Sequence, residues 1–256
     1  MAQGAALTVS RTASAVLLPL VEKLRPYLTL TAGEAAFLGE LHEPRRKLAR
    51  LRDIIVAGRR HDHLFILCGG VVSRYKVLPD GKRQVLNLGL PGDFIGFPSC
   101  LFEAAVNSVA SVTEVELSPV PFGKLFELFS RFPRVGTALF CMASCDAAIY
   151  GEHLVDLGRR SAYARLAHLV LELLVRLRSV GLAEQLSYAL PLTQELMADV
   201  LGLSVPHVNR MIRGLREEGL ATIGDRRVVV HDLAALSALA GFDERYLTPR
   251  PIPGFL

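Results

Sequence analysis

Cysteine is scarce in this 256-residue sequence. The four cysteines, Cys68, Cys100, Cys141 and Cys145, are too few for a disulfide scaffold and lack the close C-x-x-C spacing of a zinc or redox site. Their number fits a reducing cytoplasm, where we expect the protein to act. Cys141 and Cys145 lie one helical turn apart, which permits thiol redox sensing, although small residues in a helix seam explain the pair better.

Long uninterrupted hydrophobic runs are also missing. The apolar stretch from Ala13 to Val21 is too short to cross a bilayer and contains Pro19, and the stretch from Leu166 to Leu177 is broken by Glu172 and Arg176. No clear signal-peptide cleavage site closes the first stretch. We therefore expect no membrane partner, and we interpret residues 1–30 as a flexible N-terminal extension.

The sequence signatures of catalysis and of metal binding are absent as well. The chain has no nucleophile elbow, P-loop or dinucleotide-binding fingerprint, so it offers no candidate catalytic group. His61 and His63 resemble the start of a cupin metal site, but no glutamate follows four or five residues after His63. Two surface histidines before a strand are the better interpretation, and we predict neither an enzyme nor a metal protein.

Neither sign of charge dominates the sequence. The net charge of +4 and the pI of about 9.0 favour an anionic partner only weakly, and residues 187–256 contain seven arginines against eight acidic residues. The placement of those arginines is more informative than their number, because several fall on one expected helix and hairpin. With 51% hydrophobic residues, the chain can form one large or two modest domains.

Residues 191–216 show the sequence pattern of a helix-turn-helix. Thr193 can cap a first helix that carries apolar residues at helical spacing. Gly202 supplies a turn residue that tolerates positive φ, and Ser204 is a natural N-cap for a second helix. The pattern predicts two helices that cross steeply around a short turn.

The polar face of the second helix carries donors suited to phosphates and to base edges in a major groove: His207, Asn209, Arg210, Arg213 and Arg216. A short hairpin, or wing, follows, with Arg226 and Arg227 after the turn residues Gly224-Asp225. An ordinary pair of surface helices with solvated arginines would show part of the same pattern. The wing favours DNA binding over that alternative.

The first half of the chain predicts antiparallel β structure. Between residues 65 and 88, β-rich runs alternate with turn signals such as Gly69-Gly70 and Pro79-Asp80-Gly81. One further strand is predicted from Ser108 to Leu117, and a short helix from Phe122 to Phe129. The expected fold class is α+β, with an antiparallel β-roll, a long helix and a C-terminal winged helix-turn-helix.

Residues 133–157 predict a long helix with two apolar stripes that point in different directions. The first stripe, which alternates steps of three and four residues, consists of Val135, Ala138, Met142, Cys145 and Ile149. The second consists of Phe140, Ala143, Ala147, Tyr150, Leu154 and Leu157. We expect one stripe to pack on the roll. The coiled-coil spacing of the first stripe indicates that it forms the seam with a second subunit.

The order of these elements resembles the Crp/Fnr family of bacterial transcription regulators over roughly Thr31 to Leu247. The most specific parts are the run YKVLPDGKRQVLNLGLPGDFIG from Tyr75 and the run LTQELMADVLGLSVPHVNRMIRGLREEGL from Leu192. The resemblance implies a homodimer that binds an inverted repeat in double-stranded DNA, with RNA polymerase as a further candidate partner. It assigns the family's usual base-reading positions to Val205, Pro206, Asn209 and Arg210. We expect Thr193 and Ser204, at the starts of the two helices, to belong to the DNA-binding residues as well.

The chain departs from the family where effectors bind and where bases are read. Pro206 replaces the family's frequent glutamate, so the preferred DNA sequence should differ from that of the best-known members. Members that bind cyclic nucleotides carry a Gly-Glu pair and an Arg-Ser/Thr-Ala run, whereas this chain has Gly96-Phe97 and Asn107-Ser108-Val109. Members with an iron–sulfur cluster would need an N-terminal cysteine cluster, and no cysteine precedes Cys68. We predict neither cofactor.

The resemblance divides the chain into five parts. They are an extension over residues 1–30, a β-roll over 31–132, a dimerisation helix with hinge over 133–158, a winged helix-turn-helix over 159–247 and a tail over 248–256. The predicted function is sequence-specific regulation of transcription. The alternative is a ligand-binding β-roll protein whose C-terminal helices dock a protein partner, and the missing phosphate and metal residues argue against it.

Overall fold

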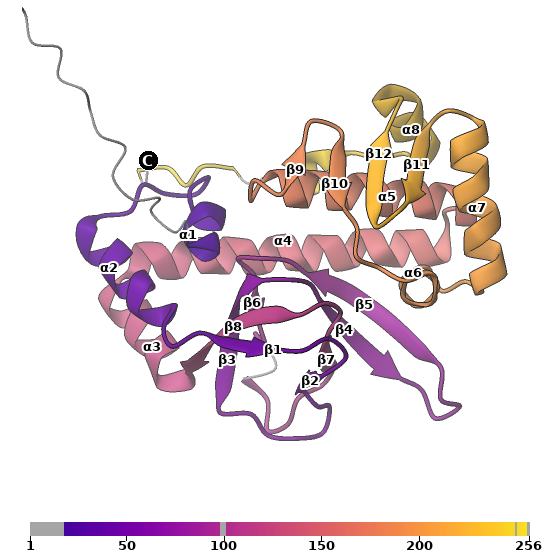
Figure 1. Ribbon diagram of the computed structural model, residues 1–256. Helices are drawn as coiled ribbons and strands as arrows, with labels where there is room; N and C mark the ends of the chain where they lie inside the picture. Colours follow the sequence, from indigo (N-terminus) through magenta and orange to yellow (C-terminus); the bar gives the residue numbers. More distant parts are fainter. Residues whose placement is uncertain (1–17, 98–100, 249, 255–256) are drawn as a thin grey trace, which may run out of the picture.

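A computed structural model describes residues 18–97, 101–248 and 250–254. Its central layer is the long helix α4 (Pro133–Gly158), with the β-roll on one side and the C-terminal unit on the other (Figure 1). After a short hinge, α5 (Ala162–Arg178) runs back along α4 (Figure 1). Helix α4 therefore lies between the two parts of the chain that the sequence predicts to sense and to bind.

In the described residues, the roll consists of two four-stranded antiparallel sheets, ordered β1-β8-β3-β6 and β2-β7-β4-β5. The strands are β1 (Arg46–Leu48), β2 (Asp53–Ile55), β3 (His63–Gly69), β4 (Val72–Val77), β5 (Arg83–Gly89), β6 (Phe94–Ile95), β7 (Ser108–Ser111) and β8 (Val115–Pro121). The prediction of one strand from Ser108 to Leu117 is wrong. The segment forms two strands, β7 and β8, which belong to different sheets. In the turn between them, the Val112 amide donates a hydrogen bond to the Val71 carbonyl (2.8 Å).

The Gly69-Gly70 turn signal has a steric reason. Gly70 has a φ of +83°, and a Cβ atom at this position would lie 2.3 Å from the carbonyl oxygen of Glu114. The turn before β4 therefore approaches the turn before β8 too closely for any side chain.

The segment just before the roll is packed rather than free. Helix α1 (Pro19–Leu24) buries Leu20 and Leu24 completely, and α2 (Ala32–Leu41) begins with a capping box between Thr31 and Glu34. The prediction of a flexible extension is therefore wrong for residues 18–30, whose apolar side chains cover α4 and the roll. Residues 1–17 lie outside the described part of the chain.

The two apolar stripes of α4 face the opposite way from the prediction. Val135, Ala138, Met142 and Ile149 are at most 9% exposed within one chain, and Cys145 lies 3.4 Å from the Tyr27 hydroxyl. Helix α1, the roll and α3 (Phe122–Arg131) supply the apolar surface that covers the first three. These five residues therefore cannot form a seam between subunits, and the stripe with Phe140 and Leu154, 70% and 72% exposed, remains open.

The C-terminal unit is a winged helix-turn-helix with one additional hairpin. Its sheet has the strand order β11-β12-β10-β9. Its elements after α5 are β9 (Ala183–Glu184), β10 (Ser187–Ala189), α6 (Gln194–Leu201), α7 (Val205–Glu217), β11 (Ala221–Gly224), β12 (Arg227–Val230), α8 (Leu233–Ala240) and the 3₁₀ helix η2 (Glu244–Tyr246). The β9–β10 hairpin is too short to appear in the sequence pattern.

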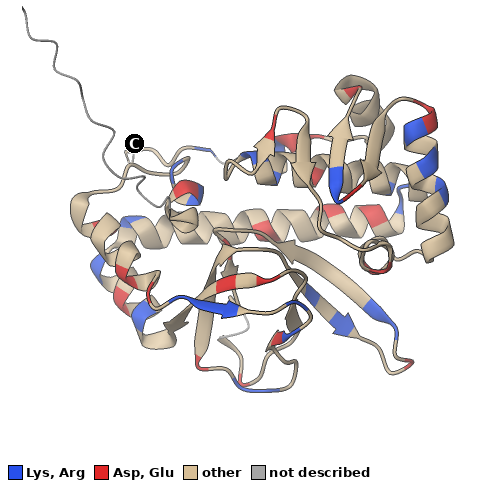
Figure 2. Cartoon of the chain, in the orientation of Figure 1, with Lys and Arg blue, Asp and Glu red and all other residues tan. Residues whose placement is uncertain are grey.

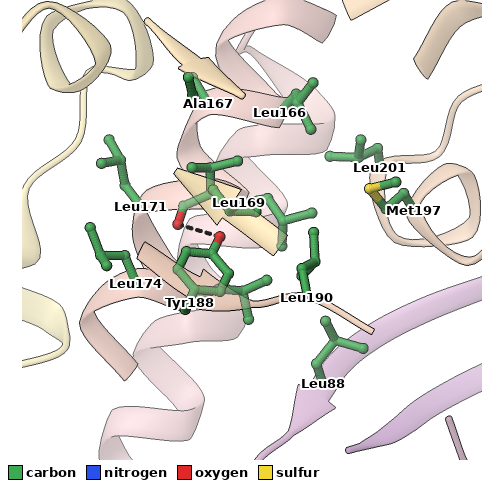
Figure 3. Close-up of a cluster of buried hydrophobic side chains, with 14 of the residues drawn as sticks. Leu88, Leu166, Ala167, Leu169, Leu171, Leu174, Tyr188, Leu190, Met197 and Leu201 are labelled. Atoms are coloured by element: carbon green, nitrogen blue, oxygen red, sulfur yellow. Dashed lines mark hydrogen bonds between the residues drawn. The ribbon is translucent and has the colours of Figure 1, made fainter. Parts of the chain in front are cut away.

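One hydrophobic core joins this unit to the roll (Figure 3). Tyr188 is buried among α5 side chains, and its hydroxyl donates to the Val170 carbonyl at 2.9 Å. From the roll, Val85, Leu88 and Leu90 enter the same cluster. Because buried apolar surface stabilises a contact in proportion to its area, this shared core fixes the winged helix-turn-helix against β5.

A buried ionic network reinforces the same junction. Glu172 on α5 is 1% exposed and accepts hydrogen bonds from His153 on α4 (3.0 Å) and from Arg176 (3.0 Å). The other ring nitrogen of His153 lies 3.0 Å from the Leu86 carbonyl of β5. Both partners of His153 are acceptors, so both ring nitrogens donate and the ring is a cation. Arg176 also donates to the Leu88 carbonyl at 2.6 Å.

The network changes the titration of both partners. Burial alone would raise the pKa of Glu172, but the hydrogen bond from His153 and the charges of His153 and Arg176 outweigh burial and lower it to about 2. Burial alone would lower the pKa of His153, but the hydrogen bond and charge of Glu172 raise it above the ordinary 6.5. The structure therefore favours the charged pair over its neutral form.

We expect His153→Gln to lower the free energy of unfolding by about 1–3 kcal/mol near pH 5.5, because a buried carboxylate loses a charged donor. Because the pKa of His153 is raised in the folded state, the protonated ring contributes its full stabilisation below pH 6.5. This contribution is lost as the pH rises through the folded-state pKa. The difference from the parent should therefore shrink near pH 9.

Urea unfolding at the two pH values measures this difference, and His63→Gln, at an exposed position on β3, is the matched control. An equal loss of stability at both pH values would contradict a charged His153.

Candidate nucleic-acid interface

The helix-turn-helix has the local geometry that its sequence predicts, except that the Ser204 side chain does not cap the second helix. The Thr193 hydroxyl accepts a hydrogen bond from the Leu196 amide and caps α6. Gly202 ends α6 in the left-handed region, with φ +65° and ψ +37°. Helix α7 begins directly after Ser204, whose side chain makes no capping hydrogen bond. The exposed Ser204 hydroxyl is therefore available to another partner.

The buried side of α7 fixes its orientation. Val208 and Leu215 are completely buried, and Val205 is half-buried at the edge of the same core. Gly214 lies against the Tyr163 ring of α5, where a Cβ atom would approach ring atoms to 3.3 Å. With this side packed, the opposite side of α7 faces outward.

The outward side of α7 is basic and unpaired. Arg210, Arg213 and Arg216 are exposed, whereas His207 and Asn209 are half-buried beside them. Figure 2 shows several basic bands and an acidic band near one end of this helix. Among the described residues, none of these five side chains has a hydrogen-bond or ion-pair partner. Cations without intramolecular partners are suited to bind phosphates and guanine edges.

The two adjacent arginines of the wing, Arg226 and Arg227, have the same predicted role but different surroundings. Asp225 and Arg226 occupy a tight turn with φ values of +49° and +58°. Arg226 is exposed and has no partner among the described residues. The Arg227 guanidinium instead donates to Ser187 at 2.6 Å and to Glu184 at 3.4 Å. Arg226 is thus free to meet a phosphate, whereas Arg227 braces the neighbouring hairpin.

The α6 cap and the wing tip lie on the border with the roll. Thr193 and Arg226 line one cleft of about 290 Å³, together with Arg50 and Arg83 of the roll. The sequence does not indicate this contact, because the arginines come from distant segments. The predicted interface residues are therefore divided into an outward helix face and a cleft beside it.

Phe97 stands at one of the positions that hold cyclic nucleotides in the resembling family, and only a small cavity lies beside it. Phe97 lines a cavity of about 30 Å³ with Lys23, Asp93 and Asp146, and Lys23 forms an ion pair with Asp93. The Arg74 guanidinium donates to the Tyr150 hydroxyl. Ligand pockets commonly measure about 300–1,000 Å³, so this cavity would have to open before a nucleotide could bind.

The cysteines and histidines of the described residues form no cluster of three or more groups that could hold a metal ion. Burial raises the pKa of the Cys68 thiol, which lies 3.3 Å from the Ser118 hydroxyl. The His61 ring accepts a hydrogen bond from the Val56 amide at 3.3 Å. Cys100 lies outside the described residues.

No helix in the described ranges has the length and apolar character to cross a bilayer.

Two family models match the chain. A cyclic nucleotide-binding domain matches residues 45–132, and a Crp-like helix-turn-helix domain matches residues 164–239. Among solved structures, FixK2 from Bradyrhizobium japonicum superposes with a TM-score of 0.70 at 24% identity, over 78% of this chain and 98% of that one. This likeness shows the fold.

Characterised relatives share sequence over most of the chain. The transcriptional activator protein FnrL of Cereibacter sphaeroides is 30% identical over 194 residues, which cover 74% of this chain and 77% of the relative. The nitrogen fixation regulation protein FixK of Bradyrhizobium diazoefficiens is 32% identical over 172 residues, which cover 67% and 71%.

We expect the arginines of the interface to differ in what they recognise. Arg210 lies near the start of α7 on its outward side, where its guanidinium can hold O6 and N7 of a guanine. Arg210→Ala should weaken binding to the preferred DNA by about 1–3 kcal/mol and relax the preference at one symmetric pair of positions. Arg226→Ala should weaken binding to all sequences, because we expect Arg226 to contact phosphates rather than bases.

Selection of binding sites from random DNA, followed by titrations with the parent and both variants, measures the two effects. If Arg210→Ala selected the parent's motif with the same information content, Arg210 would not read bases, and His207 or Asn209 would be tested next.

Proposed function

We propose that this chain, which belongs to the Crp/Fnr family of DNA-binding transcription regulators, acts as a homodimer on an inverted-repeat site. The observation that carries the proposal is the outward face of α7, with three exposed arginines that have no partner among the described residues. A buried stripe on the opposite side of α7 leaves this face free to enter a major groove. Two such helices, related by a two-fold axis, would read two half-sites.

The exposed side of α4 supports the homodimer. Its positions follow steps of three and four residues through Thr137, Phe140, Ser144, Ala147, Gly151 and Leu154, and all six are exposed. This is the spacing of a coiled-coil seam. The large apolar residues Phe140 and Leu154 flank the small residues Ser144, Ala147 and Gly151, so two copies of α4 can approach closely there. This stripe replaces the seam predicted from the sequence.

The dimer sets the spacing of the DNA site. Two helix-turn-helix units on a two-fold axis contact half-sites whose centres lie about one helical turn, roughly 34 Å, apart. Arg210, Asn209 and Val205 would read bases, while Ser204, Arg213, Arg216 and Arg226 would meet phosphates. In this assignment Arg227 supports the wing and adds charge near the backbone.

Cofactor, compartment and further partner are part of the same proposal. The relatives are regulators rather than enzymes, and we assign no catalytic activity to this chain. We assign no cyclic nucleotide and no iron–sulfur cluster, because Phe97 and Asn107 replace the family's nucleotide ligands and the cysteines lack the spacing of a cluster. Its site of action is the cytoplasm, where bacterial DNA lies. The activators among the relatives support RNA polymerase as a partner.

Selection of bound fragments from the genome tests the proposed function. The purified protein should retain a limited set of fragments that share an inverted repeat, and retention should weaken as salt is raised. Failure to retain any fragment above the level of random DNA would contradict the proposal. It would favour the alternative of a ligand-binding roll with a protein-docking C-terminal unit.

We expect the double variant Phe140→Glu/Leu154→Glu to be a monomer, because it places like charges in the α4 seam. Sedimentation velocity measures the change. The matched control Phe126→Glu/Leu182→Glu alters two exposed apolar residues outside the stripe and should remain a dimer. A dimeric Phe140→Glu/Leu154→Glu variant would contradict the assignment of the seam.

Cyclic AMP and cyclic GMP should neither bind nor change the affinity for DNA. The cavity beside Phe97 is about 30 Å³, and the cation in its wall, Lys23, is already paired with Asp93, so a phosphate would find no free charged partner there. Titration calorimetry with each nucleotide measures this directly. Saturable binding near micromolar nucleotide, about −8 kcal/mol, would contradict the expectation and would direct attention to Arg74 or Lys76 as phosphate ligands.

A further inference from the structure

A basic cleft separates the roll from the winged helix-turn-helix. It measures about 290 Å³ and is lined from the roll by Arg50 and Arg83 and from the C-terminal unit by Thr193 and Arg226. Three arginines face one carboxylate, Glu114, among the lining residues. The cleft therefore carries an excess of positive charge that comes from both parts of the chain.

The three arginines differ in their availability. Arg83 is engaged, because its Nε donates to Asp199 at 2.6 Å and its guanidinium lies 5.5 Å from the centre of the Tyr75 ring. Arg50 and Arg226 are both exposed, and neither has an ion pair or hydrogen-bonded side-chain partner within the described ranges. Two free guanidinium groups thus share the cleft, one from each side of the interface.

The backbone on both sides of the cleft is held in place. Next to Arg50, the Leu51 amide donates to the Ser111 carbonyl at 2.9 Å, and the Ser111 hydroxyl donates to the Ala49 carbonyl at 2.7 Å. On the other side, the Leu190 amide donates to the Arg226 carbonyl at 2.7 Å. Only the two arginine side chains need to be ordered when an anion binds, which lowers the entropic cost of binding.

We propose that this cleft holds a phosphate of the DNA backbone, so that Arg50 gives the roll a direct contact with the DNA bound by the winged helix-turn-helix. This inference rests on the proposed function. We assign Thr193 and Arg226 to the DNA-facing surface, and both line the cleft, so a strand that meets both of them passes the mouth of the cleft. The exposed position of Arg50 then adds a second guanidinium to the same stretch of backbone.

The contact gives the roll a role that does not require a small-molecule effector. A phosphate held by Arg50 and Arg226 links the roll to the wing, so bound DNA favours the arrangement in which the two lie side by side. The roll contributes affinity through charge and contributes no choice of sequence, because a phosphate looks alike at every base pair.

Arg50→Ala in the full-length protein tests the proposal on the DNA fragment that the parent selects. Affinity should fall roughly threefold to tenfold at low salt, and the slope of log affinity against log salt should decrease by about two, because each subunit of the dimer loses one phosphate contact. The selected motif should stay unchanged, and Arg50→Lys should restore most of the affinity. Arg59→Ala, which removes a charge from the β2–β3 loop outside the cleft, should bind like the parent.

Ethylation interference identifies the contact itself. The parent should show a sensitive phosphate in each half-site that the Arg50→Ala map lacks. Equal affinity, salt slope and interference map for the parent and Arg50→Ala would overturn the proposal, while the parent's binding to its fragment would leave the proposed function standing. Equal losses in Arg50→Ala and Arg59→Ala would also overturn it, because they would show general charge and no local contact.

A calorimetric titration with inorganic phosphate separates DNA from a small ligand. One result would overturn the DNA contact: the parent binds phosphate, the Arg50→Ala variant does not, and both proteins bind DNA with equal affinity. The cleft would then serve a small phosphorylated molecule. A parent that binds no DNA fragment at all would remove the proposed function and this inference together.

Discussion

A buried carboxylate, that of Glu172, governs how the recognition helix is held against the rest of the chain. A charge that is 1% exposed is tolerated only with charged donors around it, and these come from His153 on α4 and Arg176 on α5. His153 and Arg176 in turn hold the Leu86 and Leu88 carbonyls of β5. Because α5 packs against α7, the ionic cluster and the shared apolar core connect the roll, the long helix and the DNA-facing surface.

The long helix packs against the rest of its own chain on one side and exposes an apolar stripe on the other. One side buries Val135, Ala138 and Met142 against the roll and α1, while the other side exposes a seam from Phe140 to Leu154. In the proposed dimer the two-fold axis runs beside this seam. In each subunit, the network around Glu172 holds α5 against α4, and α5 packs against α7. The packing of the long helix therefore sets the orientation of the reading face in both subunits.

Local patterns carry most of what the sequence predicts correctly. The Thr193 cap, the positive φ of Gly202 and the wing turn depend on a few neighbouring residues, so they can be predicted without tertiary information. The α4 stripes could not be assigned in the same way, because either stripe could meet the roll until α1 is known to cover the first. Glu172 and Arg176 look only like interruptions of an apolar run, and Arg50 and Arg226 come together only in three dimensions.

Hydroxyl-radical footprinting on a fragment selected by the protein is the sharpest test of the proposal that two recognition helices, related by a two-fold axis, read one symmetric site. We expect two symmetric protected regions on one face of the duplex, with centres about one helical turn, roughly 34 Å, apart. A single protected region, or two regions whose spacing varies from fragment to fragment, would contradict it.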